Sequence, residues 1–108
     1  MDNMSSGEDQ ERYTLSRYAE DSLYDILSYI DEDNPQAADK LECEFFAAFA
    51  RIATMPSVGF MREDLTNRES VRFYIVRKYF IVYRIDLDPI RIIMVRAGVR
   101  DFSADLFD

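Results

Sequence analysis

The sequence contains no histidine and only one cysteine and three glycines among its 108 residues. Without histidine, the chain cannot form a Cys/His zinc site or the usual serine or cysteine catalytic triad. The single cysteine, Cys43, excludes an internal disulfide. Glu42 and Glu44 flank it, and this acidic setting disfavours a thiolate nucleophile. The sequence therefore favours neither a Cys/His metal site nor nucleophilic catalysis.

The usual motifs for nucleotide, zinc and redox chemistry are also absent, namely GxGxxG, the Walker loop, HExxH and CxxC. The acidic clusters within residues 20–25 and 31–33 lack the spacing of a calcium loop, so we interpret them as solvated surface. No apolar run approaches the ~18 residues of a membrane span, and the N-terminus is acidic. We therefore predict a cytoplasmic protein with no membrane partner, metal, cofactor or catalytic residue.

The charge is unevenly distributed along the chain. The formal net charge is −8, which argues against general coating of nucleic acid. Residues 1–59 hold four basic residues and thirteen acidic ones, whereas residues 60–100 hold nine basic and five acidic. An acidic first half is thus joined to an arginine-rich second half, and a functional hypothesis has to account for this division.

The first half of the chain shows strand and helix patterns. Residues 1–11 are polar and predict a disordered N-terminus, and residues 12–108 predict a single domain. Residues 12–17 alternate as a short strand, and apolar residues recur at helical spacing from about Ala19. Asn34 and Pro35 predict the start of a second helix that runs to about Thr54. Its predicted core stripe is Ala38, Leu41, Phe45, Ala48, Phe49 and Ile52.

The second half predicts three strands with period two, over residues 71–76, 79–85 and 90–96. Short turns at 77–78 and 86–89 make neighbouring strands antiparallel. The fold class is therefore α+β: an N-terminal strand, an antiparallel helical hairpin, and a three-stranded antiparallel meander covered on one face by the hairpin. One face of the sheet is predicted to carry Phe73, Ile75, Ile81, Tyr83, Ile85, Ile92 and Met94.

Two surface features point to binding, and both have a structural alternative. Arg62, Arg68 and Arg72 precede or begin the first of the three strands, and Arg96 and Arg100 end the last, so the fold can bring the two groups together. Arginines suit phosphates or carboxylates, but they also occur as ordinary surface charges. Phe46, Ala50 and Ala53 widen the apolar stripe of the second helix into either a thick core contact or a groove for a partner.

Several segments resemble the ParE branch of the RelE/ParE toxin superfamily. YIDEDNPQAA, at residues 29–38, resembles its interhelix signature, and FARIATMPSVG, at residues 49–59, resembles the end of its second helix. REDL at 62–65, Arg72, YFIVYR at 79–84 and GVRD at 98–101 continue the pattern in order. The resemblance spans about residues 12–105 and implies the RelE/ParE-like fold.

This resemblance implies a toxin of a bacterial type II toxin–antitoxin system. A ParD-like antitoxin would hold it inactive through a flexible C-terminal segment and bind operator DNA through a ribbon-helix-helix domain, so the toxin would meet operator DNA only indirectly. ParE-like toxins are associated with poisoning DNA gyrase. We expect the antitoxin to cover the helical hairpin and the sheet edge. The expected antitoxin-binding residues are Leu41, Phe45, Phe46, Phe49, Arg62, Arg72 and Arg84, and the expected target-binding residues are Arg96, Arg100 and Asp101.

The alternative is a ribosome-dependent mRNA endoribonuclease of the RelE branch. At the positions that match the nuclease's sheet arginine and C-terminal tyrosine, this chain has Phe80 and Leu106, and Arg100 alone retains its counterpart. RNA cleavage needs groups that transfer a proton and stabilise charge at the phosphate, and most of these groups are missing here. The resemblance therefore favours the hypothesis of a gyrase-binding toxin over that of a ribonuclease. Met94 and Ala97 depart from the ParE pattern, which often has a basic residue and a histidine there. A degenerate toxin retained as an interaction module is a third possibility.

Overall fold

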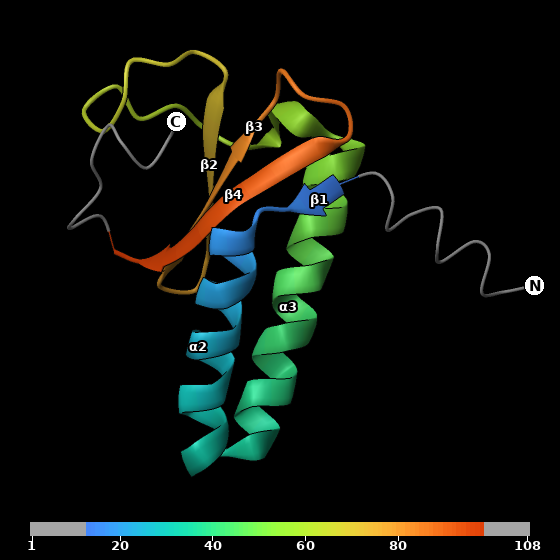
Figure 1. The fold of residues 1–108 in the computed structure, drawn as a ribbon, viewed down its shortest axis with the longest axis vertical. Helices are drawn as coiled ribbons and strands as arrows, with labels where there is room; N and C mark the ends of the chain where they lie inside the picture. The colour runs from blue at the N-terminus through green and yellow to red at the C-terminus, as the bar shows by residue number, and fades with distance from the viewer. Residues whose placement is uncertain (1–12, 99–108) are drawn as a thin grey trace, which may run out of the picture.

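The computed structural model describes residues 13–98 as a four-stranded sheet covered by two long helices (Figure 1). The predicted disordered segment, residues 1–11, lies outside the described residues. The elements in chain order are β1 (Tyr13–Leu15), α2 (Arg17–Asp33), α3 (Pro35–Thr54), the 3₁₀ turn η1 (Pro56–Val58), β2 (Val71–Val76), β3 (Tyr79–Arg84) and β4 (Ile90–Ala97). This order confirms the predicted α+β fold class.

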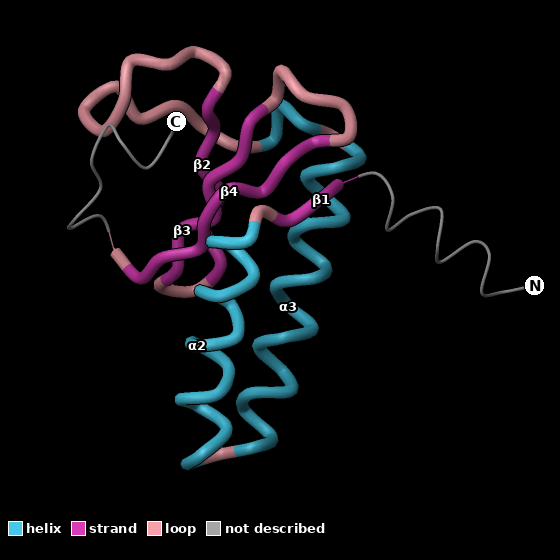
Figure 2. Tube along the Cα trace, viewed as in Figure 1, coloured by secondary structure: helices cyan, strands magenta, loops and turns pink. Residues whose placement is uncertain are grey.

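The sheet has the strand order β1-β4-β3-β2 (Figure 2). β2, β3 and β4 form the predicted antiparallel meander. β1 adds to the far side of β4 in parallel, with Tyr13 opposite Ile90 and Leu15 opposite Ile92. The sheet is therefore mixed, and its two edges are β1 and β2.

Side-chain caps define where the two helices begin. The Ser16 hydroxyl accepts a hydrogen bond of 2.9 Å from the Ala19 N–H and donates one of 2.9 Å to the Ile93 carbonyl. Because this cap satisfies a first-turn donor, α2 begins at Arg17, two residues before the predicted start. Asn34 caps α3 in the same way, accepting 3.1 Å from the Ala37 N–H, and Pro35 occupies the first turn as predicted.

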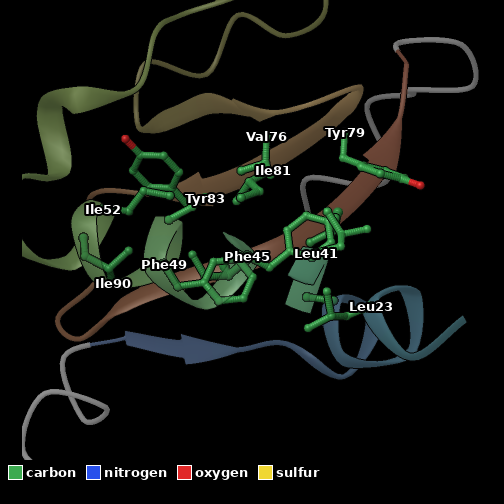
Figure 3. Packing of buried hydrophobic residues seen from close by; sticks show 14 residues of the cluster. Leu23, Leu41, Phe45, Phe49, Ile52, Val76, Tyr79, Ile81, Tyr83 and Ile90 are labelled. Carbon is green, nitrogen blue, oxygen red and sulfur yellow. The ribbon is translucent and has the colours of Figure 1, made fainter. Parts of the chain in front are cut away.

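The main core lies between the hairpin and the sheet. All six residues of the predicted α3 stripe are buried, which confirms that part of the pattern. Figure 3 shows Phe45 and Phe49 beside Ile81 and Tyr83 in this layer, and all four are fully buried. Phe45 makes an edge contact with Tyr79 across the layer, with ring centroids 5.6 Å apart.

A second, smaller core occupies the opposite face of the sheet, which we call the back face. Val71, Phe73, Val82 and Met94 are buried there, with Leu65, Phe80 and Ile93 packed against them. The prediction that Phe73, Ile75 and Met94 share a face with Ile81 was therefore wrong. Phe73 lies opposite Val82, and Ile75 opposite Phe80, so both point to the back face. The register shifts between Val82 and Tyr83 of β3, which pair with Met94 and Ile92 of β4. β4 therefore has one extra residue, Ile93, and its alternation reverses before Met94.

The hairpin is longer than the sheet that it covers. In Figure 1, α2 and α3 continue past the end of the sheet where the β2–β3 turn lies, and their connecting turn projects freely. The inner side of this overhang has no strand above it. The projecting end of the hairpin and the β2–β3 turn together enclose a groove.

Candidate partner-binding surfaces

An apolar groove lies in the angle between the projecting hairpin and the end of the sheet. It has a volume of about 840 Å³. Residues from α2, α3, the β2–β3 turn, the start of β3 and the end of β4 line it: Asp25, Ile26, Tyr29, Ile30, Ala37, Lys40, Leu41, Arg77, Lys78, Tyr79 and Ala97. Most of this lining is apolar, but the charged members are Lys40, Arg77 and Lys78 against Asp25 alone. The groove therefore combines an apolar lining with a mainly basic rim.

The β2–β3 turn is held against α3 by an ion pair. Arg77 adopts a left-handed φ of 57°, and its Nε and Nη2 donate to the two carboxylate oxygens of Glu44 at 2.6 and 2.8 Å. The hydrogen bond from Arg77 holds the pKa of Glu44 below its usual value. Lys78 lies next in the turn, with its Nζ 5.7 Å from the centre of the Tyr79 ring. Both cations are thus placed at the mouth of the groove by contacts within the chain.

The apolar residues expected to meet an antitoxin occupy different environments. Phe45 and Phe49 are fully buried and stack with ring centroids 6.3 Å apart, so they belong to the core. Leu41 is also buried, but it lines the groove. Phe46 is 39% exposed and contacts the edge of Phe49. Of these four residues, only Phe46 has an exposed side chain, because the helical period turns the other three inward.

Two of the expected arginines form local ion pairs. Arg62 donates to both carboxylate oxygens of Asp64, at 2.8 and 2.6 Å, and its guanidinium lies 5.8 Å from the centre of the Phe80 ring. Arg84 forms the same bidentate pair with Asp86: its Nε and Nη2 donate to the two carboxylate oxygens at 3.0 and 2.6 Å. These hydrogen bonds lower the pKa values of Asp64 and Asp86. Each guanidinium is thus already occupied by a carboxylate of its own chain.

Arg72 is directed toward its own backbone. Its Nη1 donates to the carbonyls of Glu69 and Val71, the second at 3.2 Å. It lies opposite Tyr83 on β3, away from Phe80, where Arg62 is found. The three arginines expected to bind the antitoxin therefore do not form one cluster.

Arg96 is the one residue of the expected target-binding set within the described chain; Arg100 and Asp101 lie outside the described residues. Arg96 lies directly opposite Phe80 across the β3–β4 pair. Its Nη1 donates 2.8 Å to the hydroxyl of Tyr18, at the start of α2. Because Arg62 also lies over Phe80, the structure brings Arg62 and Arg96 to the same part of the back face, whereas Arg72 is remote.

Several groove residues were not predicted as functional. Tyr29 is 78% exposed on α2, and Lys40, Arg77 and Lys78 form the basic rim. The sequence predicted residues 77–78 only as a turn, and an exposed tyrosine on an acidic helix carries no periodic signal. The groove forms because the two helices extend past the end of the sheet. The relative lengths of helices and strands are a tertiary feature that no local sequence pattern encodes.

Neither a metal-ligand cluster nor a membrane-spanning helix is found among the described residues. Within residues 13–98, no three His, Cys, Asp or Glu side chains are grouped in a way that would hold a metal ion. Among the same residues, neither α2 nor α3 is apolar enough over its length to cross a bilayer.

The fold matches that of known ParE-type structures. A chain from the chromosomal ParDE toxin–antitoxin system of P. aeruginosa superposes with a TM-score of 0.66 at 16% sequence identity, over 80% of this chain and 94% of that one. This likeness establishes the class: an α+β protein with the ParE-like fold. The family model for the ParE toxin of the type II toxin–antitoxin system parDE matches residues 13–102. The chain therefore belongs to the ParE toxin family. No curated protein sequence matches it significantly.

Proposed function

We propose that this ParE-family toxin arrests growth by binding DNA gyrase, and that a ParD-like antitoxin neutralises it by docking in the groove between the hairpin and the sheet. The observation that carries the docking proposal is the groove itself, about 840 Å³ with a mainly apolar lining. An apolar hollow of this size on a small domain is typical of a binding site.

The chemistry of the groove specifies its occupant. Ile26, Ile30 and Leu41 line it with aliphatic side chains, and the lysines Lys40 and Lys78 also line it. A complementary segment has apolar residues on one side and carboxylates beside them, like an amphipathic peptide laid in a groove. We therefore assign the groove to an acidic, amphipathic segment of the antitoxin.

Binding rather than cleavage is supported by the residues around Phe80. The aromatic ring stands where the RelE-like pattern has a sheet arginine, and it makes an edge contact with Phe73, with ring centroids 6.2 Å apart. Arg62 lies over the ring but is paired with Asp64. This arrangement resembles a docking patch with an aromatic centre and arginines beside it, a composition common at protein interfaces. It supports a protein target such as gyrase.

Two tyrosines of α2 give a matched test of antitoxin docking. Tyr29 is 78% exposed and lines the groove, whereas Tyr24 is 72% exposed and does not. We expect Tyr29→Ala to raise the Kd for the antitoxin at least about tenfold, as loss of a tyrosine anchor does. Tyr24→Ala should change it less than about twofold. Isothermal titration calorimetry measures both values, and equal effects of the two substitutions would refute the groove as the docking site.

The target requires a separate assay. Expression of the chain alone should arrest growth, and co-expression of the antitoxin should restore it. Purified toxin should inhibit supercoiling of plasmid DNA by gyrase, and the antitoxin should relieve that inhibition. Cleavage of mRNA in a translating extract, abolished by Arg100→Ala, would instead support the RelE-like alternative. Absence of growth arrest would contradict the toxin function itself.

A further inference from the structure

The second core, on the back face of the sheet, is deeply buried although both helices lie elsewhere. α2 and α3 pack on the opposite face, over the main core (Figure 1). Among residues 13–98, one partly buried apolar residue from outside the sheet, Leu65, packs against the second core. The core itself has four residues from three strands, each at most 1% exposed: Val71, Phe73, Val82 and Met94.

The loop that carries Leu65, residues 59–70, contacts the β2 and β3 part of this face. Phe60 forms a bridge with Phe73 of β2, and their ring centroids are 6.2 Å apart. The Arg62 guanidinium lies 5.8 Å from the ring centre of Phe80, on β3. These contacts explain why the β2 side of the second core is shielded from water.

Met94 lies one strand further from this loop, on β4. It is opposite Val82 of β3, and neighbouring strands are about 4.8 Å apart, so Met94 lies roughly 10 Å from the strand that carries Phe73. Apolar side chains on a sheet face without a covering layer stay in contact with water, yet Met94 is 0% exposed. Its burial indicates a covering segment over β3 and β4 in addition to the loop.

The chain that follows β4 begins next to this part of the face. Arg96 lies opposite Phe80, and β4 ends one residue later at Ala97. Gly98 has a left-handed φ of 79°, and its N–H donates 3.3 Å to the Lys78 carbonyl. Because this conformation lies outside the extended region, the chain turns away from the line of β4 at Gly98.

The residues after Gly98 have a composition that suits the back face. Residues 99–108, VRDFSADLFD, include three aspartates and one arginine, so the segment is acidic. Ten residues reach at most about 33 Å when extended, several times the distance across three strands. The segment also carries four apolar side chains, namely Val99, Phe102, Leu106 and Phe107.

We propose that residues 99–108 fold back over the back face and complete the second core, with Phe102 packed against Met94 and Phe80. Phe102 and Met94 are each four residues from Gly98, so a segment that folds back at Gly98 brings the two together. Phe80 already makes an edge contact with Phe73, with ring centroids 6.2 Å apart, and a third ring extends this row.

This inference goes beyond the proposed function, because it concerns how the chain covers its own sheet and holds whichever partner binds. It has a consequence for the target surface. A segment in this position brings Arg100 and Asp101 to the face that carries Arg96, so the three expected target-binding residues share one surface.

Charge and covalent linkage favour this segment over a second copy of the chain. Two copies that met through their back faces would place Arg91 and Arg96 of both on one interface, whereas the segment brings aspartates to that face. Its attachment at Gly98 also keeps the segment at a high local concentration.

Nuclear Overhauser contacts measured on the full chain, without any partner, test the proposal. The methionine methyl groups are labelled with ¹³C, and the Met94 signal is assigned by its loss in Met94→Leu. We expect a cross peak from the Met94 methyl group to a phenylalanine ring that is lost in Phe102→Leu and retained in Phe46→Leu, a control on α3.

The other outcomes each overturn the inference. Absence of a cross peak that depends on Phe102 shows that something else covers Met94. Contacts from the Phe102 ring to Ile26 or Leu41 place the segment in the groove, which Ala97 also lines. A cross peak between labelled and unlabelled chains in a mixed sample shows that the segment comes from a second copy. None of these results depends on antitoxin or gyrase, so they leave the proposed function untouched.

A double-mutant cycle gives an independent test by urea denaturation. Phe102→Ala should raise the unfolding equilibrium constant about tenfold, as loss of an aromatic contact does. In a chain that carries Phe80→Leu, which keeps an apolar side chain there, the same change should have an effect of less than about threefold. In a Tyr24→Ala background the full effect should remain, because Tyr24 lies on α2 and is 72% exposed. Equal effects of Phe102→Ala in all backgrounds would overturn the inference.

Discussion

The Tyr83 hydroxyl donates a hydrogen bond of 2.6 Å to the carbonyl oxygen of Pro56 and thereby ties the middle of the sheet to the end of the helical hairpin. The same oxygen accepts a bond of 2.9 Å from the Gly59 N–H. The Tyr83 side chain is fully buried. One phenol thus satisfies two backbone groups where the chain leaves η1 and begins the loop toward β2, so it fixes the position of that loop on the sheet.

Replacing Tyr83 by phenylalanine should weaken the fold. Tyr83→Phe leaves the ring in place but removes a partner from both Pro56 and Gly59. We expect the free energy of unfolding to fall by about 1–3 kcal/mol, the usual cost of leaving such groups unsatisfied. Urea denaturation followed by circular dichroism measures it. Tyr24→Phe, at a side chain 72% exposed, is the control and should have no effect. Equal stability of the Tyr83 variant and the wild type would contradict the role assigned to the hydroxyl.

Stability should also fall at alkaline pH. Burial raises the pKa of Tyr83 above its usual value of 10.0, and burial does the same for Tyr13. The folded state therefore favours the neutral phenols; their contribution is complete below pH 10 and is lost as pH rises through the raised values. Denaturation midpoints measured between pH 8 and pH 11 should decrease at the upper end. The decrease should be smaller in Tyr83→Phe, and an identical pH dependence in both proteins would refute this assignment.

Gly59 is required by the close approach of Tyr83. A Cβ atom at this position would clash with the Tyr83 hydroxyl and lie 2.8 Å from the Phe73 carbonyl oxygen. Since the backbone carbonyl is fixed in the Phe60 bridge, it cannot move aside cheaply. Gly59→Ala should therefore destabilise the protein by about 1–3 kcal/mol, the range for overpacking. Thermal unfolding measures the shift, with Ser57→Ala as an exposed neighbouring control. A melting temperature unchanged by Gly59→Ala would show that the loop has room.

The helices were the most predictable part of the molecule because their signals are local. The α3 stripe repeats at helical spacing, and Asn34 and Pro35 satisfy the start of that helix with groups adjacent in sequence. The same holds for the strand order, since short turns leave little choice of neighbour. β1 was predicted as a strand, but its parallel place beside β4 depends on residues more than seventy positions away.

The sheet faces and the binding surfaces were less predictable because they depend on register and on relative lengths. Residues 92–95 of β4 are all apolar, so alternation does not mark a face there, and the irregularity on β4 reverses it without a sequence signal. Likewise, Phe45 and Phe46 are adjacent aromatic residues, and only the packing of α3 shows that the first is buried and the second exposed.

Arg96 provides the last prediction, which concerns the target surface. Arg96 lies opposite Phe80 in the β3–β4 register, and its guanidinium donates 2.8 Å to the Tyr18 hydroxyl. If this part of the back face meets gyrase, Arg96→Ala should raise the toxin concentration needed to inhibit supercoiling at least about tenfold, as loss of an interface arginine does. Tyr18→Phe keeps the cation and removes only the hydrogen bond to the Tyr18 hydroxyl, so its effect should be smaller.

Controls locate this effect on the molecule. Arg91→Ala removes another back-face arginine, opposite Arg84 at the other end of β4, and should leave inhibition unchanged. Antitoxin affinity should be the same for Arg96→Ala and the wild type, because Arg96 does not line the groove. Full inhibition by Arg96→Ala would place the target surface elsewhere. If inhibition and antitoxin binding are both lost, urea denaturation separates two causes: a lowered midpoint shows that the substitution disturbed the fold, and an unchanged midpoint shows that antitoxin and target share this surface.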